Sequence, residues 1–305
     1  SLAEERFPNP GGGRAEVDGV RVVLGLFNRR RGRLYLSESG DPVMDAPFIE
    51  HNAPLIAEGA PPEVLPAMLR AAWRSGWNWG MTLSGVPPEV AAAAGGFVWR
   101  RQERVAPYVD LDAVRAAGGD YLATLSANTR QQIRRSLRAY AARGEVRLER
   151  AETVEVALEW FGELVRLHDA AWRARGQDGA FTHEFVLRFH DQMIRHGVNR
   201  GEVCLLRGRA GSSDIGYLYN LESQGWICSY QSGLRFDDGG AHYRPGIVCH
   251  VLAVMQALHR ASRRYDLLAS DARYKSALAQ SKLVLTWSSR VHDVVSARRS
   301  RHLAT

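Results

Sequence analysis

The chain has 305 residues, of which 45% are hydrophobic and 24% are charged. This balance is that of an ordinary globular protein and excludes a disordered or fibrous chain, while the length favours one very large domain or two moderate ones. The formal net charge of +7 suits an anionic ligand, and both the phosphates of CoA and an RNA backbone meet that description.

The sequence also limits location and metal chemistry. Its apolar stretches are interrupted well before the roughly 18 residues that a membrane-spanning helix needs. Residues 1–5 have neither the basic start nor the apolar core of a secretory signal, so a cytoplasmic location is the default expectation. Cys204, Cys228 and Cys249 lie far apart in apolar segments, so we expect small core residues and no metal site.

The first part of the chain alternates strands and helices around a basic turn, Asn28–Gly32. In chain order we expect strands at Val20–Phe27 and Arg33–Ser37, a helix at about Glu63–Arg74, a strand at Trp77–Leu83, a short helix at Glu89–Ala94 and a strand at Phe97–Val109. A helix from Asn128 to Ala142, capped by Ser126 or Asn128, then follows a boundary near Gly118.

The second part reads as β-α-α-β-β-β-α-β-α-β. We expect a strand at Glu145–Arg150, helices at Val154–Ala171 and His183–His196, strands at Glu202–Arg207, Ile215–Leu221 and Trp226–Ser232, a helix at Gly246–His259, a strand at Tyr265–Leu268, a short helix near Ala272–Gln280 and a strand at Leu283–Ser288. The first part repeats the later half of this order. The sequence therefore predicts a mixed α+β chain of two related domains, residues 1–117 and 118–305, the first incomplete.

Several segments resemble one protein family. The order of the second part is similar to that of the GNAT acyltransferase fold, and the segments 125–130, His168–Gly176, Tyr230–Gly246, 265–268 and 271–275 look like its BioF2-like branch, which includes the CelD proteins of cellulose synthesis. That branch is related to the Fem-type peptidyltransferases, which take an aminoacyl group from charged tRNA and share a tandem-GNAT plan. The resemblance implies a degenerate N-terminal GNAT-like domain and a more complete C-terminal one.

The resemblance also implies where an acyl donor lies. It places the thioester in a gap between the Trp226 and Tyr265 strands, with the pyrophosphate over the start of the next helix. A helix start is an anion site, because its N–H groups are unpaired and its dipole is positive there. The cofactor-binding residues expected on this basis are Gln231, Ser232, Gly233, Tyr243, Arg244, Pro245, Gly246 and Ile247. A structural interpretation is also open: Pro and Gly are common where a buried helix begins, so Pro245 and Gly246 can simply start such a helix.

Acyl transfer in such a fold needs no covalent intermediate, because an amine attacks the thioester once a base takes its proton and a donor supports the leaving thiolate. The catalytic candidates are His242, Asp271, Tyr230 and Tyr274, and the acceptor-binding candidates are His168, Trp172, Asp266 and Lys275. Each also has a structural interpretation: Asp266 can brace a strand, Lys275 can be a solvated charge, and Trp172 can pack in the core.

The expected function is therefore N-acyl transfer, most simply acetyl transfer, from acyl-CoA to a small-molecule, sugar or peptide amine. No phosphate-binding loop, serine-hydrolase elbow or His-Glu-x-x-His motif occurs, which excludes those hydrolases. Two alternatives stay open: transfer from aminoacyl-tRNA, and a non-catalytic GNAT-like scaffold. In the tRNA alternative the RNA backbone meets a basic helix ridge of Arg130, Arg134 and Arg138, which solvent can equally face.

Overall fold

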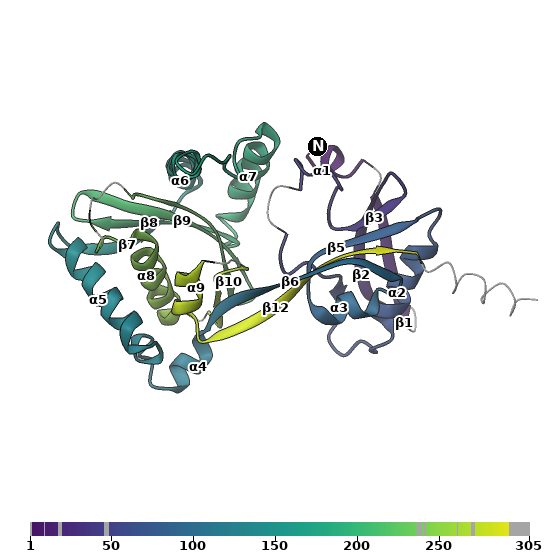
Figure 1. The fold of residues 1–305 in the computed structure, drawn as a ribbon, viewed down its shortest axis with the longest axis horizontal. Helices are drawn as coiled ribbons and strands as arrows, with labels where there is room; N and C mark the ends of the chain where they lie inside the picture. Colours follow the sequence, from purple (N-terminus) through teal and green to yellow (C-terminus); the bar gives the residue numbers. More distant parts are fainter. Residues whose placement is uncertain are drawn as a thin grey trace, which may run out of the picture. The chain divides into compact units, whose positions relative to one another are not determined.

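The computed structural model describes residues 2–8, 10–17, 20–45, 49–236, 240, 242–260, 262–269 and 272–292. The chain divides into two compact units (Figure 1). Unit 1 comprises residues 1–104 and 284–305, and unit 2 comprises residues 105–283. The last strand thus belongs with the first part of the chain from residue 284 on. The sequence-based domains of 1–117 and 118–305 remain a prediction.

Unit 1 contains one side of a mostly antiparallel sheet. Its strands lie in the order β1 (Pro10–Val17), β2 (Val20–Arg30), β3 (Arg33–Leu36), β5 (Gly80–Val86) and β12 (Ser281–Val291), and β4 (Leu55–Ile56) pairs with β2. Its helices are α1 (Leu2–Arg6), α2 (Val64–Arg74) and α3 (Pro88–Ala93). β3 and β5 are parallel. Side chains of α2, such as Met68 and Leu69, and of β5, such as Leu83, are buried in a common core.

Unit 2 contains the end of β6 (Phe97–Asp110), from residue 105 on, followed in the sheet by β11 (Arg264–Asp266), β10 (Trp226–Leu234), β9 (Ser213–Ser223), β8 (Val203–Ala210) and β7 (Val146–Arg150). Its helices are α4 (Leu111–Ala116), α5 (Ala127–Ala141), α6 (Val154–Arg173), α7 (Glu184–Gly197), α8 (Pro245–His259) and α9 (Arg273–Leu278), with a short 3₁₀ turn at Leu122–Thr124. β10 and β11 are parallel, whereas β11 and β6, β10 and β9, β9 and β8, and β8 and β7 pair antiparallel. The predicted mixed fold, with a mostly antiparallel sheet flanked by helices, is confirmed.

Alternate side chains of β9 contact helices on opposite faces of the sheet, as strand geometry requires. Leu218 shares a core with Val248 and Cys249 of α8. Its neighbours face α6, where the ring centroids of Tyr219 and Phe161 are 5.8 Å apart. In Figure 1, α6 and α7 lie on one side of β8 and β9 and α8 on the other. The sheet of unit 2 is therefore covered on both faces.

Local chemistry fixes the helix starts. The Ser126 hydroxyl accepts a hydrogen bond from the Thr129 N–H at 3.2 Å, which identifies Ser126 as the cap of α5. The Thr153 hydroxyl accepts one from the Val156 N–H and caps α6 in the same way. Thr182 does not cap α7, since His183 occupies the cap position and the Thr182 hydroxyl donates to the Gly179 carbonyl.

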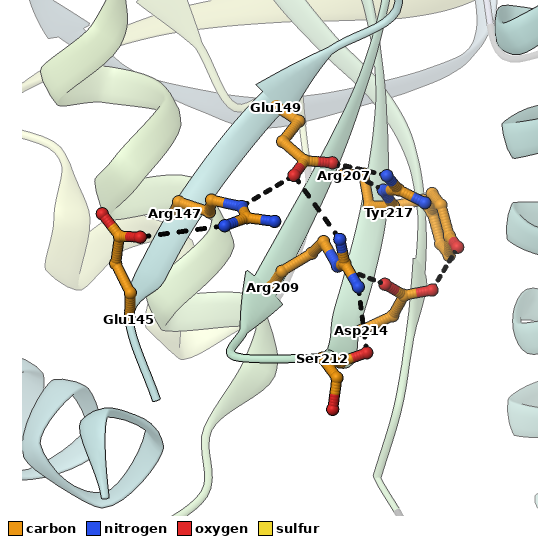
Figure 2. A network of polar contacts seen from close by, with 8 residues as sticks. All are labelled: Glu145, Arg147, Glu149, Arg207, Arg209, Ser212, Asp214 and Tyr217. Carbon is orange, nitrogen blue, oxygen red and sulfur yellow. Dashed lines mark hydrogen bonds and ion pairs between the residues drawn. The ribbon is translucent and has the colours of Figure 1, made fainter. Parts of the chain in front are cut away.

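An ionic network joins the outer strands of unit 2 (Figure 2). Glu149 of β7 accepts two hydrogen bonds from Arg207 of β8, at 2.6 and 2.9 Å, and one from Arg147 at 2.7 Å. Partial burial acts to raise the pKa of Glu149, but the hydrogen bonds and charges of Arg207 and Arg147 outweigh it and hold that pKa below its usual value. One carboxylate thus fastens β7 to β8.

We expect Glu149→Gln to lower the free energy of unfolding at pH 7 by about 1 kcal/mol, because the guanidiniums lose their shared anion. The pKa of Glu149 is depressed in the folded state, so the stabilisation is present above the unfolded pKa of about 4.3 and is lost as pH falls through the folded pKa. Urea unfolding at pH 7 and below pH 4 measures this, and the difference between variant and wild type should shrink in acid.

The matched control is Glu163→Gln, which removes a partly exposed carboxylate paired with Arg166. It should change the unfolding free energy by less than about 0.5 kcal/mol. Equal losses in the two variants would mean that the network adds nothing beyond an ordinary surface pair.

Candidate functional site

The sheet of unit 2 opens between β10 and β11. The two strands pair only over Trp226–Cys228 and Arg264–Asp266. β11 then ends, because Leu268 adopts a left-handed conformation with φ of 60° and its N–H donates to the Asp266 carboxylate at 2.8 Å. β10 continues beside β9 to Leu234. The splay that the resemblance implied between these two strands is confirmed.

β10 carries a β-bulge at the edge of this opening. Ser229 pairs with Asn220 and Gln231 pairs with Tyr219, so Tyr230 is the extra residue between them. A bulge bends its strand and redirects side chains, and bulges are over-represented near active sites.

A cavity of about 290 Å³ lies in this part of unit 2. Its lining comes from α6, β10, α8 and the start of α9. The residues are His168, Ala171, Trp172, Arg175, Ser229, Tyr230, Gln231, Ser232, Leu234, Phe236, His250, Ala272, Tyr274 and Lys275. Seven of the sequence-predicted site residues are in this list: His168, Trp172, Tyr230, Gln231, Ser232, Tyr274 and Lys275. Residues as far apart in sequence as His168 and Lys275 are thus brought to one cavity.

A buried histidine lies behind Tyr230. His190 of α7 is 2% exposed; its Nδ1 is 3.4 Å from the Tyr219 hydroxyl and its Nε2 is 3.3 Å from the Tyr230 hydroxyl. Burial lowers the pKa of His190 to about 4, so the ring is neutral at pH 7, with one donor and one acceptor nitrogen. Among the described residues, His190 is the hydrogen-bond partner of the buried Tyr219 hydroxyl.

The need to satisfy the buried Tyr219 hydroxyl assigns a direction to the hydrogen bonds that link Tyr219, His190 and Tyr230. The Tyr219 hydroxyl satisfies its hydrogen by donating to Nδ1, which leaves the proton of the imidazole on Nε2. The Nε2–H then donates to the Tyr230 oxygen. In this tautomer the Tyr230 oxygen accepts from His190, and Tyr230 lines the cavity.

A second buried histidine borders the cavity on α8. The Nδ1 of His250 is 3.3 Å from the Tyr265 hydroxyl, and its ring stacks on Tyr274 with centroids 5.9 Å apart. Burial, helped by the charge of Lys275, lowers the pKa of His250 to about 3. Burial raises the pKa of Tyr274, so its phenol keeps its proton at neutral pH. Sequence reasoning missed His190 and His250, because both lie on apolar helix faces.

His168 joins three segments around the cavity. Its Nε2 accepts a hydrogen bond from the Ala180 N–H at 3.2 Å, so its Nδ1 carries the proton and donates to the Ser232 carbonyl at 3.3 Å. Burial lowers the pKa of His168 against the opposing effect of the Ser232 carbonyl. The ring therefore fixes α6 to β10 at the cavity, where the sequence predicted an acceptor-binding residue.

The predicted pyrophosphate residues lie at the start of α8. Pro245 and Gly246 are its first two residues, after the cap residue Arg244. A Cβ on Gly246 would lie 3.2 Å from Leu234 and 3.9 Å from Tyr274, two cavity-lining residues. The helix start is thus next to the cavity, and Pro245, Gly246 and Ile247 are buried.

The side chains before α8 contact α5. The Arg244 guanidinium donates to Gln132 at 2.7 Å, and its N–H donates to the Ser136 hydroxyl. Tyr243 packs edge-on against Tyr140 and beneath the guanidinium of Arg143. Both predicted donor-binding residues therefore hold the entry to α8 against α5 in this structure.

Three other predicted residues are outside the cavity lining or cannot be placed. His242 is exposed. Asp266 is fully buried, and its carboxylate accepts from the Leu268 N–H. Asp271 lies outside the described residues.

The basic ridge of α5 divides into two kinds of residue. The Arg130 guanidinium donates to the carbonyls of Leu125 and Ala123, in the turn before the helix. Arg134 and Arg138 are exposed.

Within the described ranges, no three His, Cys, Asp or Glu side chains are arranged to hold a metal ion, and no helix has the length and apolarity to cross a membrane.

Comparisons with known proteins agree with this architecture. Residues 127–276 match the family model of the acetyltransferase (GNAT) domain. The structure of FemX is similar, with a TM-score of 0.59, 10% identity and coverage of 94% of this chain and 89% of that one. No curated protein sequence matches the chain.

Two further solved structures resemble the chain over nearly its whole length. L-PGS from Bacillus licheniformis has a TM-score of 0.57 and 12% identity, covering 97% of this chain and 92% of that one. The C-terminal domain of a protein assigned as a lysylphosphatidylglycerol synthetase, from Agrobacterium fabrum, has a TM-score of 0.54 and 14% identity. The match covers 95% of this chain and 86% of that one. The GNAT-domain match, over just under half of the chain, supports the GNAT resemblance of the second part, and the three solved structures show that the fold of the whole chain recurs in other proteins.

The closest approach of α6 to β10 occurs at Gly233, another residue predicted to bind the donor. A Cβ there would collide with the backbone of Leu164. We expect Gly233→Ala to lower the free energy of unfolding by about 1–3 kcal/mol, because a backbone cannot yield as a flexible side chain does. Thermal or urea unfolding measures it.

Gly162 of α6 is the matched control, since a Cβ added there meets nothing within 4 Å. Gly162→Ala should stabilise the chain by about 0.5–1 kcal/mol, as expected for an exposed helix position. If Gly233→Ala were as harmless, the close packing of α6 on β10 would be excluded.

We expect His190 to make the chain sensitive to acid. Its pKa of about 4 lies below the unfolded value, so the unfolded state binds more protons and stability falls as pH drops from about 6.5 toward 4. His190→Gln should reduce the slope of the unfolding free energy against pH, by up to about 1.4 kcal/mol per pH unit. The readout is the pH slope of the unfolding free energy. His196→Gln, an exposed change on the same helix, should keep the wild-type slope.

Proposed function

We propose that this chain transfers an acyl group from acyl-CoA to an amine by direct attack on the thioester. The proposal rests mainly on the opening of the sheet after Cys228 and Asp266, with the bulge at Tyr230 on one side and the start of α8 next to it. The GNAT-domain match over residues 127–276 supports the same reaction class. We also propose, from the sequence resemblance, the BioF2-like and CelD-containing branch.

The cavity fits the reacting end of such a donor. Its volume of about 290 Å³ is near the lower limit of small-molecule sites, so it suits an acyl group and its thioester rather than a whole nucleotide. Beyond it, the unpaired N–H groups at the start of α8 provide the positive dipole end that suits a pyrophosphate. Leu234 and Tyr274 lie between the cavity and Gly246, and they are the side chains that a donor reaching both would contact.

Two tyrosines have suitable positions for proton and charge transfer. Tyr230 is oriented by His190 and can donate a hydrogen bond to the thioester oxygen, where negative charge develops during attack. Tyr274 keeps its proton at neutral pH because burial raises its pKa, so it can protonate the leaving thiolate. The amine loses its proton to a base, for which His242 and Asp271 remain our candidates.

The acceptor side is proposed at α6. His168 and Trp172 line the cavity together with Arg175, and the His168 and Trp172 ring centroids are 5.8 Å apart. His168 acts there by holding the Ser232 carbonyl, so its proposed contribution is the shape of the acceptor pocket. Lys275 donates to the Leu267 carbonyl at 2.6 Å and fixes the turn after β11.

A second candidate is transfer from aminoacyl-tRNA. It is favoured by whole-chain similarity to FemX and to a protein assigned as a lysylphosphatidylglycerol synthetase, whose name describes a lysyl product. The exposed Arg134 and Arg138 offer the RNA backbone a contact on α5. The chemistry at Tyr230 and Tyr274 would be the same, because an ester replaces the thioester.

Donor binding separates these functions. We expect acetyl-CoA to raise the melting temperature of the wild type, and Gly246→Glu to abolish the rise, because the new carboxylate repels the pyrophosphate beside Leu234 and Tyr274. Gly162→Glu adds the same charge at an exposed helix position and should keep the rise. No shift with acetyl-CoA or longer acyl-CoA thioesters would contradict the CoA proposal.

The remaining outcomes identify the alternatives. A shift with aminoacyl-tRNA that is lost in an Arg134→Ala, Arg138→Ala double variant would establish the second candidate. Binding of neither donor by a folded chain would leave the non-catalytic scaffold.

Where transfer is observed, Tyr274→Phe should lower kcat roughly 100-fold with little change in donor binding, because only the proton donor is removed.

A further inference from the structure

Unit 1 contains a groove that the proposed acyl transfer does not use. It has a volume of about 760 Å³ and lies between the start of β1, the β2–β3 turn and the end of α2. Gly11, Gly12 and Gly13 of the edge strand β1 leave one wall without side chains. Arg14, Arg29 and Arg31 line it, and none of the described lining residues is acidic. We call it the Arg31 groove.

The arginines keep their positive charge available. Arg29 is held by neutral groups, donating from Nε to Asn78 at 2.9 Å and from Nη2 to the Ser75 carbonyl. Arg31 is exposed and forms no ion pair with a described residue. Arg14 has a single distant carboxylate partner, Glu16, at 3.9 Å and largely exposed. A concave surface with charge of one sign focuses the field on an anionic ligand.

Two tryptophans lie next to Gly32, a residue of the groove lining. Trp77 is 79% exposed and Trp79 is 42% exposed. A Cβ on Gly32 would come within 2.7 Å of both indoles, so they flank this glycine. Exposed apolar side chains that lie together mark interaction sites, whereas scattered ones do not.

Hydrogen bonds fix the tryptophans and the turn in place. The Trp79 Nε1–H donates to the Arg31 carbonyl at 2.8 Å, which supports the left-handed conformation of Arg31. The Arg33 guanidinium lies over the Trp79 ring, 4.4 Å from its centroid. Asn78 is buried and bonds Arg29 and the carbonyls of Trp73 and Gly76. The charged turn and its aromatic border are therefore one preorganised surface.

We propose that the Arg31 groove binds a short segment of single-stranded nucleic acid. Its phosphates pair with Arg14, Arg29 and Arg31, and its unstacked bases stack on Trp77 and Trp79. A basic groove combined with exposed aromatic side chains is the arrangement that such strands require. A flat lipid surface would not reach guanidiniums that line a concavity, and an acidic peptide has no bases for the indoles. This proposal does not depend on the acyl donor that we propose for unit 2.

The test is fluorescence anisotropy of a labelled 12-nucleotide oligouridylate with the full chain at several salt concentrations. Three phosphate contacts predict that log K falls against log salt with a slope of about −2. Arg31→Ala should reduce the slope by about 0.7. Trp77→Ala should weaken binding roughly 10-fold with the slope unchanged, since stacking releases no counterions.

Matched controls lie in the same unit outside the groove lining. Arg101→Ala removes an exposed arginine paired with Glu103, and Trp99→Ala removes an indole that is 75% exposed. Both should bind the oligonucleotide as the wild type does. Thermal unfolding checks that each variant is folded, and the acetyl-CoA shift should be the same in Arg31→Ala as in the wild type, so the two proposals fail separately.

Three results would overturn the proposal. One is binding that is unchanged in both Arg31→Ala and Trp77→Ala, or weakened equally by the controls. Another is competition by uridine monophosphate at equal phosphate concentration, which would make the groove a mononucleotide site. The third is binding to anionic lipid vesicles that depends on Arg31 and Trp77 when the oligonucleotide does not bind.

Discussion

The limited pairing of β10 with β11 is the constraint on which the site of unit 2 depends. Parallel strands normally continue together, but here the buried Asp266 carboxylate accepts from the Leu268 N–H and turns β11 away after three residues. Lys275 then donates to the Leu267 carbonyl and secures the turn. Two residues predicted to touch substrate thus shape the opening. A buried carboxylate is tolerated in this position because it makes a charge-assisted bond to the backbone.

The opening is surrounded by aromatic and imidazole groups whose protons are fixed. His168, His190 and His250 all have lowered pKa values because burial disfavours the imidazolium. Each bonds a group on a neighbouring segment, which orients its ring. Tyr230 and Tyr274 consequently face a site whose charge does not change near neutral pH. Such preorganisation is what stabilising a developing oxyanion requires, since no dipole has to reorient during reaction.

Much of this arrangement was predictable, and the exceptions have physical reasons. The elements from Val146 onward follow clear helical and strand periodicity, and the position of Tyr230 and Tyr274 follows from the order of strands. The strand Pro10–Val17 was missed because its glycines and proline disfavour strands, and only pairing with β2 makes it one. His190 was missed because its partners Tyr219 and Tyr230 are 29 and 40 residues away, which no local pattern reveals.

The lowered pKa values also restrict how the amine is activated. A histidine with a pKa of about 4 or 3 is too weak a base to accept the proton of an amine near neutral pH. His190 and His250 therefore belong to positioning, and the proton must leave through water or through a group outside the buried ring cluster. His242 is exposed and meets that condition. Replacing it should lower the rate at neutral pH and matter less at a pH high enough for the acceptor amine to be neutral without a base, whereas replacing a positioning histidine should lower the rate at every pH.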